Sequence, residues 1–162
     1  MVELEFVPRP EPKAEDGRIR HMPTGFGFEE AAALSFGGMT ALAFLQGGNL
    51  SRGERLLVIG ASGAVGSAAI QIAKHMGAEV TGVTSSPNVE LVRTLGADNV
   101  VDYTRGDYLM SGDTYDVVFD TVGATDFTAC KRALGGGHDE PGYVDLSATS
   151  WALGKKALVK RL

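Results

Sequence analysis

Apolar positions along the chain follow two spacings, one typical of buried strands and one typical of helices. Short apolar runs predict five strands, at residues 55–60, 78–84, 99–103, 115–123 and 142–147. Apolar residues that recur every three or four positions predict helices, at residues 28–46, 64–76, 86–95 and 126–134. Gly77 and Gly96 stand where a glycine commonly ends a helix, and Ser86 followed by Pro87 is typical of an N-cap and a first turn.

The order of these elements predicts the fold class. Strand and helix alternate four times with connections of only a few residues. Consecutive parallel strands require right-handed crossovers, which place helices against the faces of the sheet. We therefore expect an α/β protein with a doubly wound parallel sheet and helices on both of its faces.

Two changes in composition mark the ends of the chain. Residues 1–22 hold nine charged residues and three prolines at alternate positions, which excludes a helix or a central strand and predicts an extended lead-in. The last eight positions hold four basic residues, on the polar side of what looks like the start of an amphipathic helix. We expect one domain over residues 23–162 with an incomplete C-terminal end, because no apolar run remains for a sixth strand.

Composition and charge exclude several classes of protein. The chain has 162 residues, 22 glycines without a regular period, and a net charge of −5 that argues against a nucleic-acid surface. It has neither an apolar run of about 20 residues that could span a membrane nor the apolar core of a secretory signal. The single cysteine, Cys130, excludes an internal disulfide, so we expect a reducing, cytoplasmic setting.

The most informative segment is the turn GASGAVG at residues 60–66, which follows a predicted strand and opens a predicted helix. A helix start offers unpaired N–H groups and the positive end of the helix dipole, so it can bind a phosphate. Gly63 would permit close approach of a pyrophosphate and Gly66 would let the helix pack on the strand, whereas Ala61 replaces the first glycine of the G-x-G-x-x-G pattern. The alternative is a glycine turn that binds no ligand.

Three other classes of nucleotide-binding protein fit this turn less well. A Walker A loop requires a lysine after the last glycine, and Ser67 stands there. A methyltransferase usually has an acidic residue at the end of the second strand, and none lies between Val80 and Val89. A short-chain dehydrogenase requires Tyr-x-x-x-Lys, which no tyrosine of the chain satisfies.

The missing acidic residue also bears on the choice of cofactor. An NAD site has Asp or Glu about 20 residues after the glycines, bonded to the ribose 2′-hydroxyl. Here the strand ends in Thr84, Ser85 and Ser86, whose hydroxyls suit a 2′-phosphate. We predict NADP(H) in preference to NAD(H). No cation is adjacent, since Arg93 lies two turns into the helix, and ordinary helix capping by these hydroxyls is the alternative.

Four segments together resemble a known family: HMPTGFGFEEAAALSFGGMTAL, GASGAVG, GVTSSPNVELVRTLGADNVVDY and DVVFDTVG. They are similar to the medium-chain dehydrogenase/reductase (alcohol dehydrogenase) superfamily, above all to its zinc-independent quinone oxidoreductase branch, which includes zeta-crystallin. The resemblance covers residues 21–147 and implies a Rossmann-type nucleotide-binding domain, here truncated to five strands. Such a domain is normally paired with a GroES-like catalytic domain, of which residues 1–22 would be the remnant.

The resemblance also implies where the cofactor would lie. The pyrophosphate would lie along Ser62, Gly63, Ala64 and Val65, and the adenosine end would lie among Ser85, Ser86 and Tyr103. The ribose would face Val122 and Gly123, and the nicotinamide would lie near Thr40 and Ser147. Thr84 completes the set of predicted cofactor-binding residues. One position departs from the family pattern, because Asn88 stands where some NADPH-dependent relatives have a lysine.

The resemblance also indicates whether a zinc site should be expected. Zinc-dependent relatives have a cysteine ligand in the segment equivalent to residues 33–41, and ALSFGGMTA contains no Cys, His, Asp or Glu. We therefore expect no zinc. The consecutive residues 138–140 (His-Asp-Glu) are interpreted as a solvated turn, His75 as a surface residue and Cys130 as a small buried residue.

Two functions of different classes follow from these observations. In the first, the chain is the cofactor-binding domain of an NADP(H)-dependent, zinc-free oxidoreductase that transfers a hydride between nicotinamide and a quinone, enone or similar carbonyl compound. Its catalytic residues would lie in the missing domain, and we expect this chain alone to be inactive and the full-length protein to be a homo-oligomer without membrane or nucleic-acid partners. In the second, the chain is a non-catalytic module that binds a nucleotide, senses redox state or binds another protein.

Overall fold

Five parallel strands form a single sheet in the computed structural model, which describes residues 22, 24–106, 112–125, 130, 133–134 and 142–145. The strand order is β3-β2-β1-β4-β5. Their bounds are Arg55–Ile59 (β1), Glu79–Thr84 (β2), Asn99–Asp102 (β3), Val117–Asp120 (β4) and Gly142–Asp145 (β5). Each strand lies inside a predicted run, and the α/β fold class is confirmed.

The central strands are apolar because both of their faces are covered. In β1, Leu56, Leu57, Val58 and Ile59 are at most 2% exposed although successive side chains point to opposite faces. Leu57 pairs with Thr81 of β2 on one side and with Val118 of β4 on the other. An uninterrupted apolar run therefore marks a strand in the middle of this parallel sheet.

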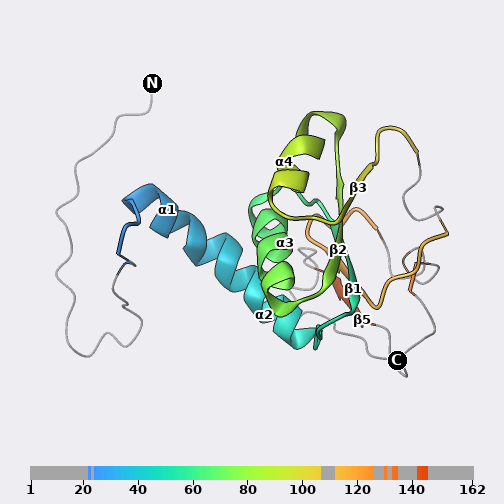
Figure 1. Ribbon diagram of the computed structural model, residues 1–162, viewed down its shortest axis with the longest axis horizontal. Helices are drawn as coiled ribbons and strands as arrows, with labels where there is room; N and C mark the ends of the chain where they lie inside the picture. The colour runs from blue at the N-terminus through green and yellow to red at the C-terminus, as the bar shows by residue number, and fades with distance from the viewer. Residues whose placement is uncertain are drawn as a thin grey trace.

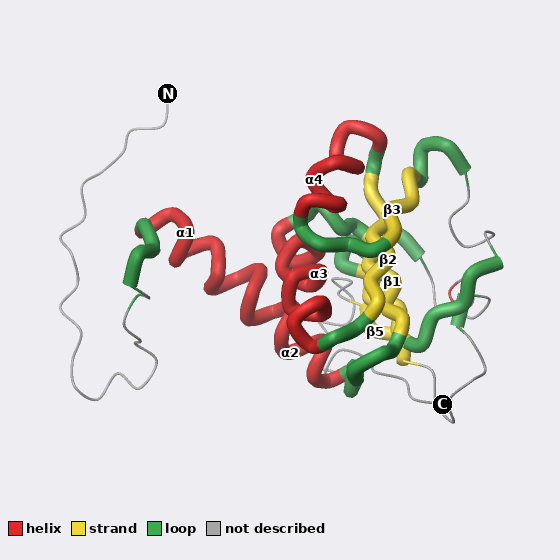
Figure 2. The backbone as a smooth tube through the Cα atoms, viewed as in Figure 1, coloured by secondary structure: helices red, strands yellow, loops and turns green. Residues whose placement is uncertain are grey.

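Helices cover one face of the sheet (Figure 1). Their bounds are Phe28–Ala33 (α1), Met39–Gly47 (α2), Ala64–Met76 (α3) and Val89–Thr94 (α4), with a π-helical segment η1 at Leu34–Gly38 and a 3₁₀ turn η2 at Ser86–Asn88. Figure 2 shows α2, α3 and α4 on the same side of the strands. Residues of all three helices join strand residues in one core, where the rings of Phe44 and Phe119 stack with their centroids 5.7 Å apart.

The predicted helix 28–46 is helical throughout but contains the π-helical segment η1. Gly37 lies in this segment, and a Cβ on it would stand 2.5 Å from the carbonyl oxygen of Ala64. The segment therefore packs directly on the first turn of α3, an approach that only glycine permits. Helical spacing alone does not distinguish a π turn from an α-helix, so the sequence analysis missed it.

The second face carries a smaller core that includes Leu57, Val118 and Cys130. Cys130 is fully buried, as predicted, and is helical, while the rest of the predicted helix 126–134 lies largely outside the described residues. The predicted lead-in and the C-terminal helix also lie outside them. In the part of the chain that the structure describes, no helix is long and apolar enough to cross a membrane.

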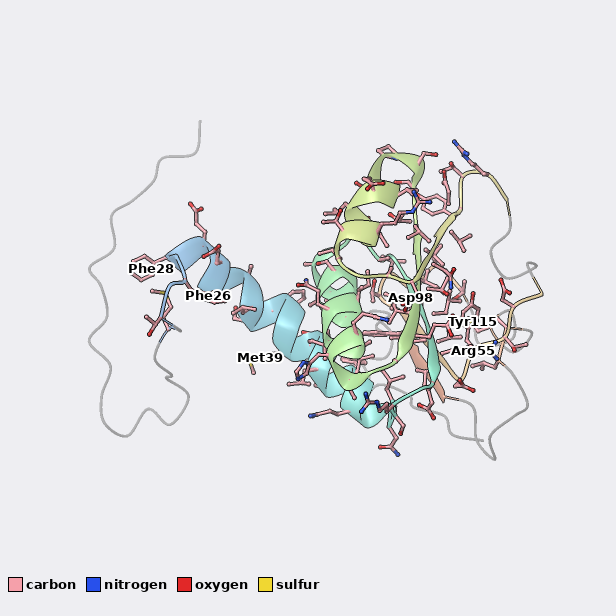
Figure 3. All side chains as sticks on the ribbon, in the orientation of Figure 1. Phe26, Phe28, Met39, Arg55, Asp98 and Tyr115 are labelled. Atoms are coloured by element: carbon pink, nitrogen blue, oxygen red, sulfur yellow. The ribbon has the colours of Figure 1, made fainter. Side chains whose placement is uncertain are left out.

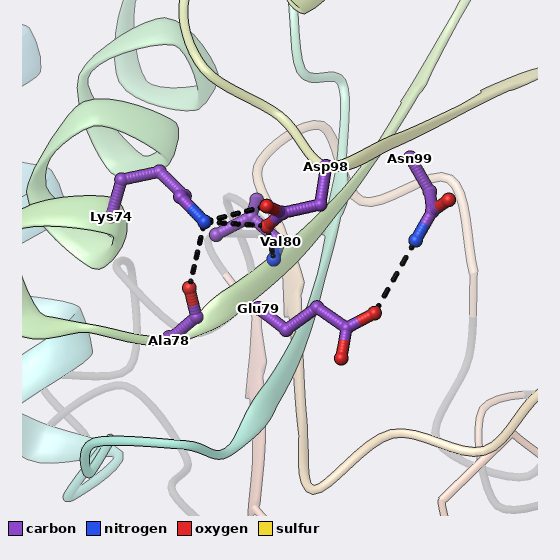
Figure 4. A network of polar contacts seen from close by, with 6 residues as sticks. All are labelled: Lys74, Ala78, Glu79, Val80, Asp98 and Asn99. Carbon is purple, nitrogen blue, oxygen red and sulfur yellow. Dashed lines mark hydrogen bonds and ion pairs between the residues drawn. The ribbon is translucent and has the colours of Figure 1, made fainter.

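A polar network joins the end of α3 to the starts of β2 and β3 (Figure 4). The Lys74 Nζ donates to both carboxylate oxygens of Asp98 at 2.7 Å and to the carbonyl of Ala78 at 3.3 Å, while the backbone N–H of Val80 donates to Asp98 at 2.7 Å. Partial burial opposes the charge on Asp98, but the bonds from Lys74 and Val80 outweigh it and lower the pKa of that carboxyl. The network fixes the end of the sheet opposite the glycine turn.

Candidate functional site

The glycine turn after β1 brings the start of α3 against the strand. The backbone of Gly60 has φ +79°, in the left-handed region that favours glycine. A Cβ on Gly66 would lie 2.2 Å from the carbonyl oxygen of Gly60. The spacing of the glycines in this turn therefore has a physical cause, because the turn can close only if Gly60 and Gly66 have no side chain.

The start of α3 presents backbone N–H groups without intrahelical partners. Ser67 donates to the carbonyl of Gly63 at 2.8 Å, which is the first helical bond. The N–H groups of Ala64, Val65 and Gly66 precede it and have no acceptor within the helix. Gly63 is the N-cap, and no side chain caps this end. Three donors and the positive end of the helix dipole thus suit an anion such as a phosphate.

A groove of about 480 Å³ runs beside this helix start, at the carboxyl ends of β1, β2 and β4. Its lining residues are Ile59, Gly60, Ser62, Gly63, Val83, Thr84, Ser85, Asn88, Tyr103, Val122 and Ala124. The strand order reverses between β1 and β4, where one crossover proceeds to each side of the sheet. Ligands of open α/β sheets bind at such a switch point, so topology and groove indicate the same place.

The structure brings six of the residues proposed to bind the cofactor into this groove. They are Ser62, Gly63, Thr84, Ser85, Tyr103 and Val122. Ala64 and Val65 belong to the first turn of α3, and Gly123 adjoins Val122. Thr40 lies on α2 and does not line the groove, and Ser147 lies outside the described residues.

Hydroxyl groups join the two loops that form one wall of the groove. The Thr84 hydroxyl, almost fully buried at the end of β2, donates to the Ser62 hydroxyl at 2.9 Å. Ser85 adopts extended backbone as the N-cap of the 3₁₀ turn, and its hydroxyl accepts from the Asn88 side-chain amide at 3.3 Å. The predicted N-cap, Ser86, is therefore wrong by one residue, because a 3₁₀ turn precedes α4.

Ser86 faces a different part of the surface. Its hydroxyl donates to the carboxylate of Asp102, the last residue of β3, and it does not line the groove. This bond and those from Thr104 lower the pKa of Asp102, so the carboxylate is charged at neutral pH. The NAD pattern predicts an acidic residue at the end of the second strand, whereas Asp102 lies at the end of the third.

Asp120 shapes the loop beside the groove, a role that the sequence patterns did not predict. It ends β4, is fully buried, and accepts bonds from the N–H groups of Val122, Gly123 and Thr125 at 3.0, 2.8 and 2.9 Å. The Thr125 hydroxyl adds a fourth bond at 2.8 Å. One carboxylate thus shapes the loop that carries Val122 into the groove. An acidic residue directly after an apolar strand and before Thr-Val-Gly was the available signal.

The described residues do not form a recognisable metal site. Among them, no three His, Cys, Asp or Glu side chains gather closely enough to hold an ion. The segment at residues 33–41 forms the end of α1, η1 and the start of α2 and supplies no nitrogen, thiolate or carboxylate ligand.

Comparison with known proteins identifies the family. The family model described as zinc-binding dehydrogenase matches residues 64–137, which include the glycine turn's helix and the β2–β4 region. The chain belongs to the medium-chain dehydrogenase/reductase superfamily. It corresponds to the nucleotide-binding domain of that superfamily, and the predicted resemblance is confirmed.

Curated relatives extend well beyond this chain. The 2-methylene-furan-3-one reductase of Solanum lycopersicum is 39% identical over 111 residues, which are 67% of this chain and 29% of that protein. The mitochondrial NAD(P)H oxidoreductase RTN4IP1 of Mus musculus is 42% identical over 115 residues, 66% of this chain and 29% of that protein. The chain thus spans less than a third of the length of these relatives.

A solved structure supports the same assignment. The quinone oxidoreductase of Thermus thermophilus, described together with its NADPH complex, is 31% identical and superposes with a TM-score of 0.63. The match covers 72% of this chain and 40% of that one. The fold and the family therefore rest on both sequence and structural similarity.

Proposed function

We propose that this chain is the NADP(H)-binding domain of a zinc-free oxidoreductase that acts on a quinone, enone or similar carbonyl compound. The observation that carries the proposal is the groove at the switch point of the sheet, faced by the uncapped start of α3. At Gly66, where a Cβ would collide with the carbonyl of Gly60, α3 packs directly on the turn, and this packing brings the helix start to the groove. The residues present therefore fit a dinucleotide.

Each part of the groove suits one part of such a cofactor. The N–H groups at the start of α3 and the bare backbone of Gly63 would hold the pyrophosphate. Ser85 and Tyr103 line the end of the groove toward β3, where they would meet the adenosine. Val122 and Ala124 form an apolar wall on the β4 side that would face the ribose and exclude water.

The groove would hold a cofactor but has few side chains that could donate or accept a proton. Of the lining residues that the structure describes, only Tyr103 has a titratable side chain, and it is 54% exposed. A bound nicotinamide would supply the hydride chemistry. Groups that polarise the substrate would come from the domain that the superfamily places before this one. The names of the Solanum and Thermus relatives support enones and quinones as the substrate class.

The same observation favours a second candidate, a nucleotide-binding module that senses redox state without catalysis. Such a module needs the groove but no acid–base residue. The choice is tested on the full-length protein that the first proposal implies, with NADPH and a panel of enones and quinones. Turnover of any of them supports the oxidoreductase, whereas NADPH binding without turnover across the panel favours the sensor.

The remaining expectations about the whole protein stay predictions. They are the absence of zinc, a homo-oligomeric state, the lack of membrane and nucleic-acid partners, and a cytoplasmic setting. The murine relative is named as a mitochondrial protein, so the compartment is best determined by imaging a tagged full-length protein.

A thermal-shift titration of the chain with NADPH and NADH tests the cofactor site. A ligand that binds only the folded state raises the free energy of unfolding by about 2.7 kcal/mol at a hundredfold excess over its Kd. We expect both cofactors to stabilise the chain, and NADPH more strongly. Val122→Glu would place a carboxylate in the groove and abolish the shift, because the carboxylate would repel the cofactor's phosphates. Val122 is 61% exposed, so the substitution should leave the fold intact.

A matched control separates loss of the site from loss of the fold. Leu91 on α4 is 48% exposed and does not line the groove, so Leu91→Glu should leave the NADPH shift unchanged. A chain that melts cooperatively and is stabilised by neither cofactor contradicts the proposal.

A further inference from the structure

A second groove adjoins the proposed cofactor groove at the outer edge of β3. It has a volume of about 540 Å³, and its lining includes Ser86, Arg93, Asp102 and Arg105. Ser86 directly follows Ser85, and Asp102 directly precedes Tyr103, and both of these neighbours line the first groove. A ligand that occupies the first groove up to Tyr103 would thus meet the second groove next.

Asp102 organises this second groove and has no acceptor capacity to spare. One carboxylate oxygen accepts from the Thr104 N–H at 3.0 Å and from the Thr104 hydroxyl at 2.7 Å. The other accepts from Ser86 and lies 3.3 Å from Nε of Arg105. A carboxylate that accepts from a ribose 2′-hydroxyl is typical of NAD sites. The Asp102 side chain is 11% exposed and already has these four donors, so it is poorly placed for that role.

Arg105 is the cation nearest to this cluster. Its Nε lies 3.3 Å from Asp102 and its side chain is 82% exposed, so most of the guanidinium is open to a ligand. A guanidinium has five N–H donors in a planar fork, which allows it to bridge a carboxylate and a phosphate at once. Because Arg105 is largely exposed, its ion pair with Asp102 is weak and leaves the arginine side chain free to adjust.

Arg93, the other arginine of the groove, is placed less well. It lies in the last turn of α4 and is 61% exposed, with its guanidinium 3.7 Å from Glu90 on the same helix. It contacts neither Ser86 nor Asp102 in any bond of the cluster described above.

We propose that Arg105 recognises the 2′-phosphate of NADP(H), with Ser85 and Ser86 beside it, and so determines the preference for NADP(H) over NAD(H). The inference rests on the proposed function, because it requires that the adenosine end of a dinucleotide lies at Ser85 and Tyr103. It places the specificity cation after β3, where neither strand periodicity nor the glycine motif indicates it.

Isothermal titration calorimetry with NADPH and with NADH tests this assignment on the wild-type chain and on Arg105→Ala, Arg105→Lys and Arg93→Ala. Arg105→Ala should weaken NADPH binding by about 10- to 100-fold, the range for a lost bond to a charged group, and leave NADH binding unchanged. Arg105→Lys should restore part of the loss, because it keeps the charge without the planar fork. Arg93→Ala is the matched control and should bind both cofactors like the wild type.

Salt provides a readout that a merely structural role of Arg105 would not change. Added salt should weaken wild-type binding of NADPH more than of NADH, because the extra charge pair is screened, and this difference should disappear in Arg105→Ala. The inference is overturned if Arg105→Ala loses affinity for both cofactors equally, if it loses no affinity, or if Arg93→Ala shows the loss instead. None of these outcomes contradicts the proposed cofactor-binding domain. A wild-type chain that binds neither cofactor overturns the proposed function itself.

Discussion

Asp120 shows how one buried side chain can shape a binding loop. Its four hydrogen bonds come from three backbone N–H groups and one hydroxyl within five residues of it. Asp120→Asn would turn an amide N–H toward these donors and leave some of them unpaired. We expect the free energy of unfolding to fall by about 1–3 kcal/mol and NADPH affinity to fall as the loop at Val122 loosens.

Thr125→Val is the graded comparison for this prediction. It removes the hydroxyl bond to Asp120 at 2.8 Å and keeps the three backbone bonds, so both effects should be smaller than in Asp120→Asn. Urea unfolding and NADPH titration measure them. Asp120→Asn with wild-type stability and wild-type affinity would show that the loop holds its shape without the carboxylate.

At the scale of single residues, sequence patterns predicted which residues share the groove better than they predicted the polar partners of those residues. The glycines and the strand-end hydroxyls are local signals, and Ser62, Gly63, Thr84 and Ser85 do share one groove. The bond from Ser86 to Asp102 joins residues 16 positions apart. Such a contact depends on how two strands are aligned, and residue spacing in one sequence does not contain that information.

At the scale of elements, the strands were the most predictable part. β1 and β4 are buried on both faces, so each appears as an apolar run of roughly the right length, whereas β3 is only partly buried. Helix ends were less predictable, because the π segment at Leu34–Gly38 depends on contact with α3 and the start of α4 depends on a 3₁₀ turn. These details arise from packing between elements rather than from local propensity.

The junction of β1 and α3 supports a prediction that separates folding from binding. A Cβ on Gly66 would collide with the carbonyl of Gly60 at 2.2 Å, whereas a Cβ on Gly63 would lie 3.3 Å from the same oxygen. Gly66→Ala should therefore force α3 away from β1 and lower the free energy of unfolding by about 1–3 kcal/mol. Gly63→Ala should cost less than about 1 kcal/mol, yet weaken NADPH binding, because its methyl group stands where the pyrophosphate would approach.

Differential scanning calorimetry without ligand and calorimetric titration with NADPH distinguish the two variants. The expected pattern is a lower Tm for Gly66→Ala and a near-normal Tm with reduced affinity for Gly63→Ala. If Gly63→Ala binds NADPH like the wild type, the pyrophosphate does not pass over this turn.

At the scale of the whole molecule, the sheet topology determines where the groove lies, and one helical segment projects from the body of the fold with apolar side chains exposed. The reversal of strand order between β1 and β4 opens the groove at the carboxyl ends of the central strands. On the other side of the fold, the helical segment from α1 to α2 projects from the body and carries exposed Phe28 and Met39, and exposed Phe26 lies just before it (Figure 3). Phe28, Phe36 and Met39 are 73%, 69% and 69% exposed.

This distribution predicts opposite effects for substitutions on the two sides of the same helical segment. Phe36→Ser combined with Met39→Ser removes apolar surface that is already in water, so the free energy of unfolding should change by less than about 1 kcal/mol. The binding of a fluorescent hydrophobic dye to the native chain should fall, because the exposed apolar area shrinks.

Phe44→Ser is the matched control, since that ring stacks on the fully buried Phe119 with centroids 5.7 Å apart. It should lower the free energy of unfolding by about 2 kcal/mol or more and should raise dye binding. Equal destabilisation by the double variant and by Phe44→Ser would mean that Phe36 and Met39 are covered in solution, and that the apolar side of this segment packs against other parts of the chain.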